Sequence, residues 1–533
     1  NNKVSVATYH TITQEAVEGW EIPASVTSDP TTVTTGNASV DSALAPASAT
    51  PTNQTFSLTT NTDNITGGDG NDTVNASSTT LNSDDQVNLG AGADTLTVAA
   101  AGAGNILANF QGIETVKGTN TAGNYQMNMI AATDVDAVVS RLSSAQVTYN
   151  NLQNLTSVEA YGVTGGSVVE ANYTNSLASG TSDSLTLKAD AGSNVVFEVS
   201  GVTDTNEFET INVESNGSLA NTVAVRDAGG NAPASLGTLN VSGAAALTMT
   251  LQSTKAKATF DASSATGKQT ITWGGGTTTL KGGSADDLFN ASAGSFLGAT
   301  NPKTVTGNGG TDTLRLTENV ANLTSNTATQ PHVIDVDTIN YVVSVLEADN
   351  ANKTRTLAAD KISNESTVAV TISNLDTGNT DQSNAVITGI TDEAITATST
   401  EAAAQAVTSL SVALKTATGT ADSLTVTMAN PGAAAVNQLD TLTFAGNTEI
   451  ANIVNDSTDV LTARGTTITA LAAGQSNTIN LSGAGGLTIT ALEIADPAGT
   501  AVGVINASGT SGKFDLGAAA TDFKTTDTDG VAI

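Results

Sequence analysis

The sequence predicts an all-β fold, an extended β-solenoid or β-roll in which short coils stack on one another. Three observations predict it. Residues 67–75 match the glycine-rich nonapeptide G-G-x-G-x-D-x-U-x, with U a large apolar residue, which is typical of stacked β-coils. Short strings of alternating apolar and polar residues recur along the chain. Thr, Ser, Ala, Asn, Gly and Val dominate the composition and only 3% of residues are aromatic, as in thin β-structures with small side chains.

Composition also bounds the size and the partners of the protein. The chain has 533 residues, more than one ordinary domain holds, and 39% of them are hydrophobic, which supports a folded core. Its 51 acidic and 18 basic residues give a net charge of −33, so the surface repels nucleic acid and anionic lipid and attracts divalent cations. The absence of cysteine excludes disulfides and thiolate metal sites. No apolar run approaches the ~18 residues of a transmembrane helix, so no transmembrane segment is expected.

Residues 1–60 precede the first nonapeptide and are predicted to form a connector or linker. Residues 1–20 resemble the end of a helical element, and residues 21–60 are rich in Pro, Thr, Ser and Ala, the composition of an extended segment with few packing contacts. The first folded unit is therefore expected to begin after residue 60.

The first predicted turn has Asp72 as its acid and Val74 as its large apolar residue. Glycines permit positive φ and let the carbonyl groups of a tight turn face inward, while the β-branched residue enters the core of a short strand. One such turn supplies only part of the roughly 6–8 oxygen ligands that Ca²⁺ takes, so a second turn has to stack on it. The motif therefore predicts calcium bound between stacked turns.

A near-copy of this turn follows it, with Asp94 as its acid, and Asp85 precedes Asp94 by one nonapeptide. In a roll of two half-coils per turn, equivalent positions on one side recur every ~18 residues. The step from position 72 to position 94 therefore corresponds to one coil plus a short insertion. We expect this register to bring Asp72 and Asp94 to one metal ion, with Asp85 as a further acid of the same roll.

The pair of turns recurs in the second half of the chain, with Asp287 and Asp312 as the equivalent acids and a longer insertion between them. Here Ala285 replaces the third glycine, and Lys303 stands where the first roll has Asp85. We expect this second site to bind calcium more weakly than the first, because it has lost one acid and one glycine.

Ordinary hairpin turns also use Gly, Asn and Asp. A hairpin turn alone, however, gives no reason for the acid and the apolar residue to keep the same phase four times. The candidate metal-ligating residues are Gly68, Asp69, Gly70, Asn71, Asp72, Asp85, Gly92, Asp94, Gly283, Asp286, Asp287, Gly310 and Asp312.

Between the rolls, residues 110–116, 208–213 and 336–342 alternate apolar and polar residues, and each string is predicted to form a strand with one polar face. Residues 152–159 have the same pattern. Ala131–Leu142 differs, because its apolar residues fall on one face of a helix; a further strand is the alternative, and the pattern does not decide between them.

Three longer strings recur in the same order. Residues 180–187 return as 419–426, residues 238–250 as 478–490, and residues 260–268 as 505–513, at offsets of 239, 240 and 245. Biased composition would not preserve this order. We therefore expect two tandem copies of one unit, over residues 61–280 and 281–533, each a roll followed by a stack of strands.

No catalytic motif is recognisable. The two histidines are His10 and His332, and neither a G-x-S-x-G string nor an H-E-x-x-H string occurs. The sequence therefore predicts that the protein is not an enzyme.

The nonapeptides, the acidic cysteine-free composition and the carboxyl end, an acid followed by small apolar residues, resemble the repeats-in-toxin (RTX) proteins exported by Gram-negative bacteria. Within that group, the body rich in Thr, Ala, Gly and Asn, the paired rolls and the strings at 110–116 and 260–263 resemble surface-layer (S-layer) proteins of the Caulobacter type. The resemblance is specific over residues 67–97 and 282–316.

This resemblance implies a β-solenoid lattice subunit whose folding and self-assembly need Ca²⁺, type I secretion, and an extracellular location on the bacterial cell surface. It also implies homo-oligomers and attachment to lipopolysaccharide, although the sequence has no recognisable anchoring domain. The alternative is an RTX-type adhesin or filament subunit. A lattice protein is expected to form sheets when calcium is added, whereas an adhesin is expected to stay monomeric until it meets its ligand.

Overall fold

The structure of the chain is a computed structural model. It describes residues 51–101, 104–107, 109–201, 207–227, 229–251, 258–272, 277–292, 296, 303–318, 332–345, 353–361, 367–374, 382–391, 394–401, 407–418, 421–428, 438–446, 448–455, 466–472, 478–494, 503–512, 514–515, 524–525 and 531–532. The predicted helical element, most of the predicted connector and the acid-rich carboxyl end lie outside the described residues.

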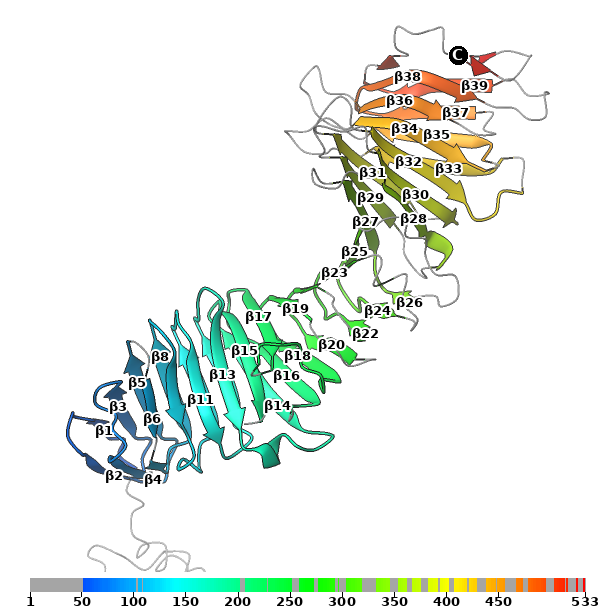
Figure 1. Cartoon of the computed structure of the whole chain (residues 1–533). Coiled ribbons are helices and arrows are strands. Elements are labelled where there is room, and N and C mark those ends of the chain that lie inside the picture. Colours follow the sequence, from blue (N-terminus) through cyan, green and yellow to red (C-terminus); the bar gives the residue numbers. More distant parts are fainter. Residues whose placement is uncertain are drawn as a thin grey trace, which may run out of the picture.

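The chain coils into a long parallel β-solenoid (Figure 1). One of its faces, sheet A, is 13-stranded. Its strands are β1 (Thr55–Ser57), β3 (Thr73–Ser77), β5 (Thr95–Ala100), β8 (Thr115–Asn120), β10 (Ala137–Arg141), β12 (Ser157–Tyr161), β14 (Ser184–Asp190), β16 (Thr210–Ser215), β18 (Thr238–Gly243), β20 (Ala258–Ala265), β22 (Thr277–Lys281), β24 (Thr304–Thr306) and β26 (His332–Ile334).

The facing sheet, sheet C, extends along nearly the whole solenoid. Its strands are β6 (Gly104–Leu107), β9 (Tyr125–Asn128), β11 (Val147–Leu152), β13 (Ser167–Tyr173), β15 (Asn194–Gly201), β17 (Asn221–Arg226), β19 (Leu247–Thr250), β21 (Gln269–Thr272), β23 (Leu288–Ser292), β25 (Thr313–Glu318), β27 (Thr338–Val345), β29 (Thr367–Asn374), β31 (Ala394–Glu401), β33 (Ser423–Met428), β35 (Ile450–Asn455), β37 (Thr478–Gly483), β39 (Gly503–Thr510) and β42 (Val531–Ala532). Strands β6 and β42 lie at opposite ends of the molecule (Figure 1).

Two smaller sheets complete the structure. Sheet B consists of β2 (Asn64–Gly68), β4 (Gln86–Gly90) and β7 (Phe110–Gln111). Sheet D, which faces the second part of sheet C, consists of β28 (Lys353–Ala358), β30 (Gln382–Ile390), β32 (Val407–Leu414), β34 (Gln438–Ala445), β36 (Thr466–Ala472), β38 (Leu487–Ile494), β40 (Phe514–Asp515) and β41 (Lys524–Thr525). The solenoid changes direction where sheet A ends and sheet D begins (Figure 1).

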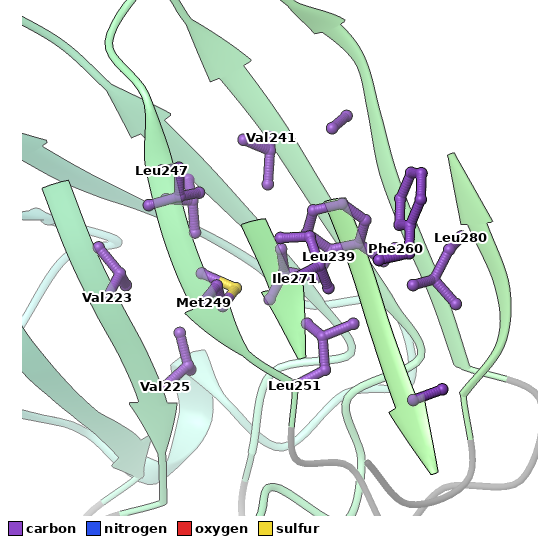
Figure 2. Packing of buried hydrophobic residues seen from close by; sticks show 14 of the residues in the cluster. Val223, Val225, Leu239, Val241, Leu247, Met249, Leu251, Phe260, Ile271 and Leu280 are labelled. Atoms are coloured by element: carbon purple, nitrogen blue, oxygen red, sulfur yellow. The ribbon is translucent and has the colours of Figure 1, made fainter. Parts of the chain in front are cut away.

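Beyond the first coils, where sheet B also takes part, each coil gives one strand to each of two facing sheets. Neighbouring strands pair in parallel, as β14 does with β16 and β15 with β17. Apolar side chains alternate inward along the strands and fill the space between the sheets. In Figure 2, Val223 and Met249 from sheet C lie opposite Leu239 and Phe260 from sheet A. A coil therefore buries its apolar residues only against its neighbours, so stability depends on an uninterrupted stack.

The predicted all-β solenoid is confirmed. The described helical elements include two short 3-10 turns, η1 (Asn175–Leu177) and η2 (Ala359–Lys361). Of the two alternatives for Ala131–Leu142, the strand is correct, because Ala137–Arg141 forms β10. In the described ranges, no helix has the length and apolar character to cross a membrane. The division into units at residues 280 and 281 stays a prediction; β21 and β23 pair across it.

Candidate metal centre

The structure brings Asp72 and Asp94 together. Asp72 directly precedes β3 and Asp94 directly precedes β5, and these strands pair with Thr73 opposite Thr95. The two aspartates therefore lie one above the other on adjacent coils. The backbone N–H of Asp72 donates to Asp94 Oδ1 at 2.6 Å.

Asp287 and Asp312 have the same arrangement. They directly precede β23 and β25, which pair with Leu288 opposite Thr313. The backbone N–H of Asp287 donates to Asp312 Oδ1 at 2.7 Å. The two predicted rolls therefore share one local geometry, although the first lies at the start of sheet A strands and the second at the start of sheet C strands.

The first aspartate of each pair has both carboxylate oxygens occupied by backbone amides. Each accepts one N–H from the preceding coil and one from its own glycine turn. The four bonds are Gln54 N to Asp72 Oδ1 (2.6 Å), Gly68 N to Asp72 Oδ2 (3.0 Å), Gln269 N to Asp287 Oδ1 (2.7 Å) and Gly283 N to Asp287 Oδ2 (2.6 Å). These carboxylates fix the register between coils whether or not a metal is bound.

The second aspartate of each pair, Asp94 or Asp312, is different. Both side chains are buried, with exposed fractions of 0% and 1%. In each, Oδ1 accepts a backbone amide, but Oδ2 is buried without a hydrogen-bond partner in the described part of the chain. Leaving a buried carboxylate oxygen unpaired costs free energy, and the same atom is in this position at both turns.

Burial also changes how these carboxyl groups titrate. It raises the pKa of Asp94, and the charge of Asp72 raises it further. Burial raises the pKa of Asp312 to about 6, and the neighbouring charges of Asp287 and Asp337 act in the same direction. A cation beside the carboxylate would reverse both effects, because it favours the charged form.

Three glycines lie so close to the carboxylates that no side chain would fit at their positions. At each, an added Cβ would collide with a carboxylate oxygen of the aspartate that ends the same turn and with a backbone carbonyl oxygen of the next coil. The sets are Gly67 with Asp72 and Leu89, Gly282 with Asp287 and Gly307, and Gly307 with Asp312 and Asp335. Carboxylate and carbonyl oxygens thus converge at the turns, and these are the ligands that Ca²⁺ prefers.

Asp85 and its predicted counterpart Lys303 lie elsewhere. Asp85 precedes β4 of sheet B, and its carboxylate accepts the backbone amides of Asp63 at 2.9 Å and Asn82 at 2.8 Å. Lys303 directly precedes β24, and burial lowers its pKa. Asp85 therefore caps backbone amides beside sheet B, whereas the stacked pair lies at the start of sheet A strands.

The residue before the first aspartate also connects adjacent coils in both rolls. Ala93 N donates to Asn71 Oδ1 at 2.9 Å, and Thr311 N donates to Asp286 Oδ1 at 2.7 Å. Of the other predicted residues, Gly70 is buried, Asp69 is exposed, and Gly92 and Gly310 have φ of +148° and +103°. These positive φ angles explain why glycine occupies the second turn of each pair.

The structure adds acids that the sequence analysis did not select. Asp94 N donates to Glu114 Oε2 at 2.6 Å, and Asp312 N donates to Asp337 Oδ2 at 2.7 Å. Each of these acids directly precedes a strand and caps the coil before it. The signal in the sequence was an acid within each strand-like string at 110–116 and 336–342.

In the part of the chain that the structure describes, no three acidic or histidine side chains lie close enough to hold one metal ion. A calcium ion at these turns would therefore combine the Asp94 or Asp312 carboxylate with backbone carbonyl groups, as glycine-rich turns allow. The residues present fit such an ion through the unpaired Oδ2 atoms.

No protein-family model, curated protein or solved structure matches this chain. A function therefore has to follow from the chemistry of the turns and from the shape of the solenoid.

Without calcium, the wild-type protein is expected to lose stability relative to Asp312→Asn as pH rises from about 4 to about 6. Because the folded state raises the pKa of Asp312 to about 6, the protonated carboxyl stabilises the fold below pH ~4, and this contribution is lost as pH rises through ~6. Between pH ~4 and ~6, the free energy of unfolding of the wild type should fall by roughly 2 kcal/mol relative to that of Asp312→Asn. Chemical denaturation of both proteins in EGTA at pH 4, 5, 6 and 7 measures it; parallel stability curves would contradict the prediction.

Proposed function

We propose that this chain is a structural S-layer subunit whose folding and self-assembly outside a Gram-negative bacterium depend on calcium. The observation that carries the proposal is the buried, unpaired Oδ2 atom of Asp94 and its counterpart in Asp312. These two turns lie far apart in the sequence, yet they share this feature together with the same backbone hydrogen bonds. A cation bound at each turn would give the Oδ2 atom of that turn a partner.

Calcium would couple binding to folding. The chain has a net charge of −33, so its acids repel one another when no cation is bound. Asp94 and Asp312 become adjacent to Asp72 and Asp287 only after the coils have stacked. An ion that binds the stacked turns therefore stabilises the folded state over the unfolded one. Low calcium in the cytosol would keep the chain unfolded for type I secretion, and calcium outside would fold it.

The extended solenoid supports a structural role. Its coils bury apolar residues only against neighbours, which leaves long outer faces available for contacts with other copies. We include in this proposal a location on the cell surface, the absence of enzymatic activity, and attachment to lipopolysaccharide. Sedimentation of the calcium-loaded protein with lipopolysaccharide vesicles tests the last point; protein that stays in the supernatant would rule it out.

We also propose that the chain contains two tandem copies of one unit. Asp183 N donates to Glu209 Oε2 and Asp422 N donates to Glu449 Oε2, both at 2.9 Å. These bonds are in sheets A and C, respectively, so an equivalent surface would face opposite sides of the solenoid in the two copies. Beyond them, glycines at 243 and 483 have the same φ of +107°.

Assembly tests the proposed function. The purified full chain is expected to form ordered two-dimensional sheets in millimolar calcium and none in EGTA or in magnesium alone, as seen by negative-stain electron microscopy. Magnesium is the matched control, because it demands octahedral geometry and keeps its water. Monomers in calcium would instead support the adhesin, and fibres would support the filament subunit. Assembly that is equal in EGTA would contradict the calcium mechanism.

A further inference from the structure

A row of exposed apolar side chains runs along one edge of the solenoid, where the chain passes from sheet A to sheet C. Leu142 follows β10, Tyr161 ends β12 and Leu219 lies between β16 and β17. Their exposed fractions are 52%, 41% and 59%. The backbone N–H of Leu142 donates to the carbonyl oxygen of Tyr161 at 2.7 Å, so these two turns are adjacent.

Small residues join the two ends of this row. A Cβ on Gly162 would lie 2.7 Å from Leu142 Cδ2 and 4.0 Å from Ala191 Cβ. A Cβ on Gly192 would lie 3.1 Å from Leu219 Cβ. Leu142 and Leu219 therefore flank a floor of glycine and alanine, and together they form one continuous apolar edge, which we call the Leu142–Leu219 edge.

Opposite charges lie two coils apart along this edge, on the coils of β10 and β14. Arg141 is exposed, and its guanidinium lies over the Tyr161 ring at 5.3 Å from the centroid. Arg141 pairs with Tyr161 in register, and Tyr161 pairs with Asp190, so about 10 Å separates Arg141 from Asp190. Arg141 forms no ion pair in the described part of the chain.

We propose that the Leu142–Leu219 edge is a contact between two copies of this chain, related by a twofold axis that sets the two edges antiparallel. In this arrangement Arg141 faces Asp190 of the partner subunit, and the Leu142 and Leu219 side chains, which lie beside Gly162 and Gly192, pack against the apolar edge of the partner subunit. The twofold axis repeats both contacts, as in any isologous interface. The inference rests on the proposed function, because it names a surface through which the lattice subunit meets its neighbour.

Charge and composition favour a second copy as the occupant. Copies with a net charge of −33 repel one another, so a contact between them needs apolar area and local opposite charges. The edge has both, and its charges match only when it meets itself in the antiparallel sense. Tyr and Arg are also the side chains that contribute most at protein interfaces. An edge of only a few side chains supports a weak contact between two copies. In a lattice each copy would make several such contacts, so the overall association would be stronger.

Sedimentation velocity of the full chain at fixed calcium, over a range of protein concentrations, tests the inference. Leu142→Glu and Leu219→Glu are expected to weaken self-association about tenfold or more, without changing the circular dichroism spectrum, because both positions are exposed. The matched control is Leu155→Glu, which is 54% exposed but lies on the opposite edge between β11 and β12. It should associate like the wild type.

A charge exchange tests the antiparallel geometry independently. Arg141→Asp and Asp190→Arg should each weaken association, and the double exchange should restore it. A monomeric wild type, an equal loss in Leu155→Glu, or a double exchange no better than the single variants would overturn the inference. Calcium titrations of the same samples separate the two proposals: calcium-dependent folding with no edge-dependent association overturns only the edge, and an intact edge with calcium-independent folding overturns only the proposed function.

Discussion

Replacing Asp94 and Asp312 together by Asn is expected to remove most of the stabilisation that calcium gives. Asn keeps an oxygen that can accept the backbone N–H of Asp72 or Asp287, but it has no charge to bind the ion. Saturating calcium at about 100 times its Kd stabilises a single-site protein by about 2.7 kcal/mol, so two sites give roughly 5 kcal/mol. In EGTA the double variant should be no less stable than the wild type, because it no longer buries an unpaired carboxylate.

Thermal and chemical denaturation at pH 7, in EGTA and in millimolar calcium, measure both effects. The matched control is Glu209→Gln with Glu449→Gln. These acids cap the amides of Asp183 and Asp422 in the same way but lie outside the glycine turns. The control should keep the full calcium response. If the Asn variant responds to calcium as strongly as the wild type does, the aspartates act only as caps of the backbone.

The solenoid could be predicted from the sequence because each coil repeats the same short-range pattern. The string at 208–213 overlaps β16 (Thr210–Ser215), where buried residues alternate with half-buried ones. Ala131–Leu142 was ambiguous for a physical reason. Its strand β10 buries Val138, Val139 and Ser140 in succession, which breaks the alternation, and Leu142 has a φ of +52° that turns the chain. Helical spacing and a strand with consecutive buried residues cannot be distinguished from apolar positions alone.

The stacking of Asp72 on Asp94 could also be predicted, because equal phase in successive coils places equivalent residues on one side. What each carboxylate binds could not. An aspartate oxygen either accepts a hydrogen bond from an amide of the preceding coil or has no partner. Which of the two occurs depends on the register between two segments that lie 18 to 25 residues apart. Sequence spacing gives that register only to within an insertion. For the same reason, Glu114 looked like one residue of a polar strand face and proved to be a cap.

Gly67→Ala and Gly282→Ala are each expected to destabilise the protein by about 3 kcal/mol or more, at the upper end of the cost of adding atoms to a packed site. The cost is steric, because the new methyl group would collide with the Asp72 or Asp287 carboxylate and with the backbone of the next coil. A backbone carbonyl cannot move without shifting the whole stack. Calcium should not rescue these variants, because the collision is with the Asp72 or Asp287 carboxylate and the backbone, which an ion beside Asp94 or Asp312 would not relieve.

Gly165→Ala is the control that separates space from backbone conformation. Gly165 has a φ of +69°, a conformation that is unfavourable for alanine. An added Cβ there would nevertheless meet nothing within 4 Å. This change should cost only about 1 kcal/mol. Denaturant titration of the three variants in calcium gives the comparison. A loss at Gly67 no larger than that at Gly165 would show that the turn can widen to accept a methyl group, and a turn so loose could not hold Asp72 and Asp94 in fixed positions around a calcium ion.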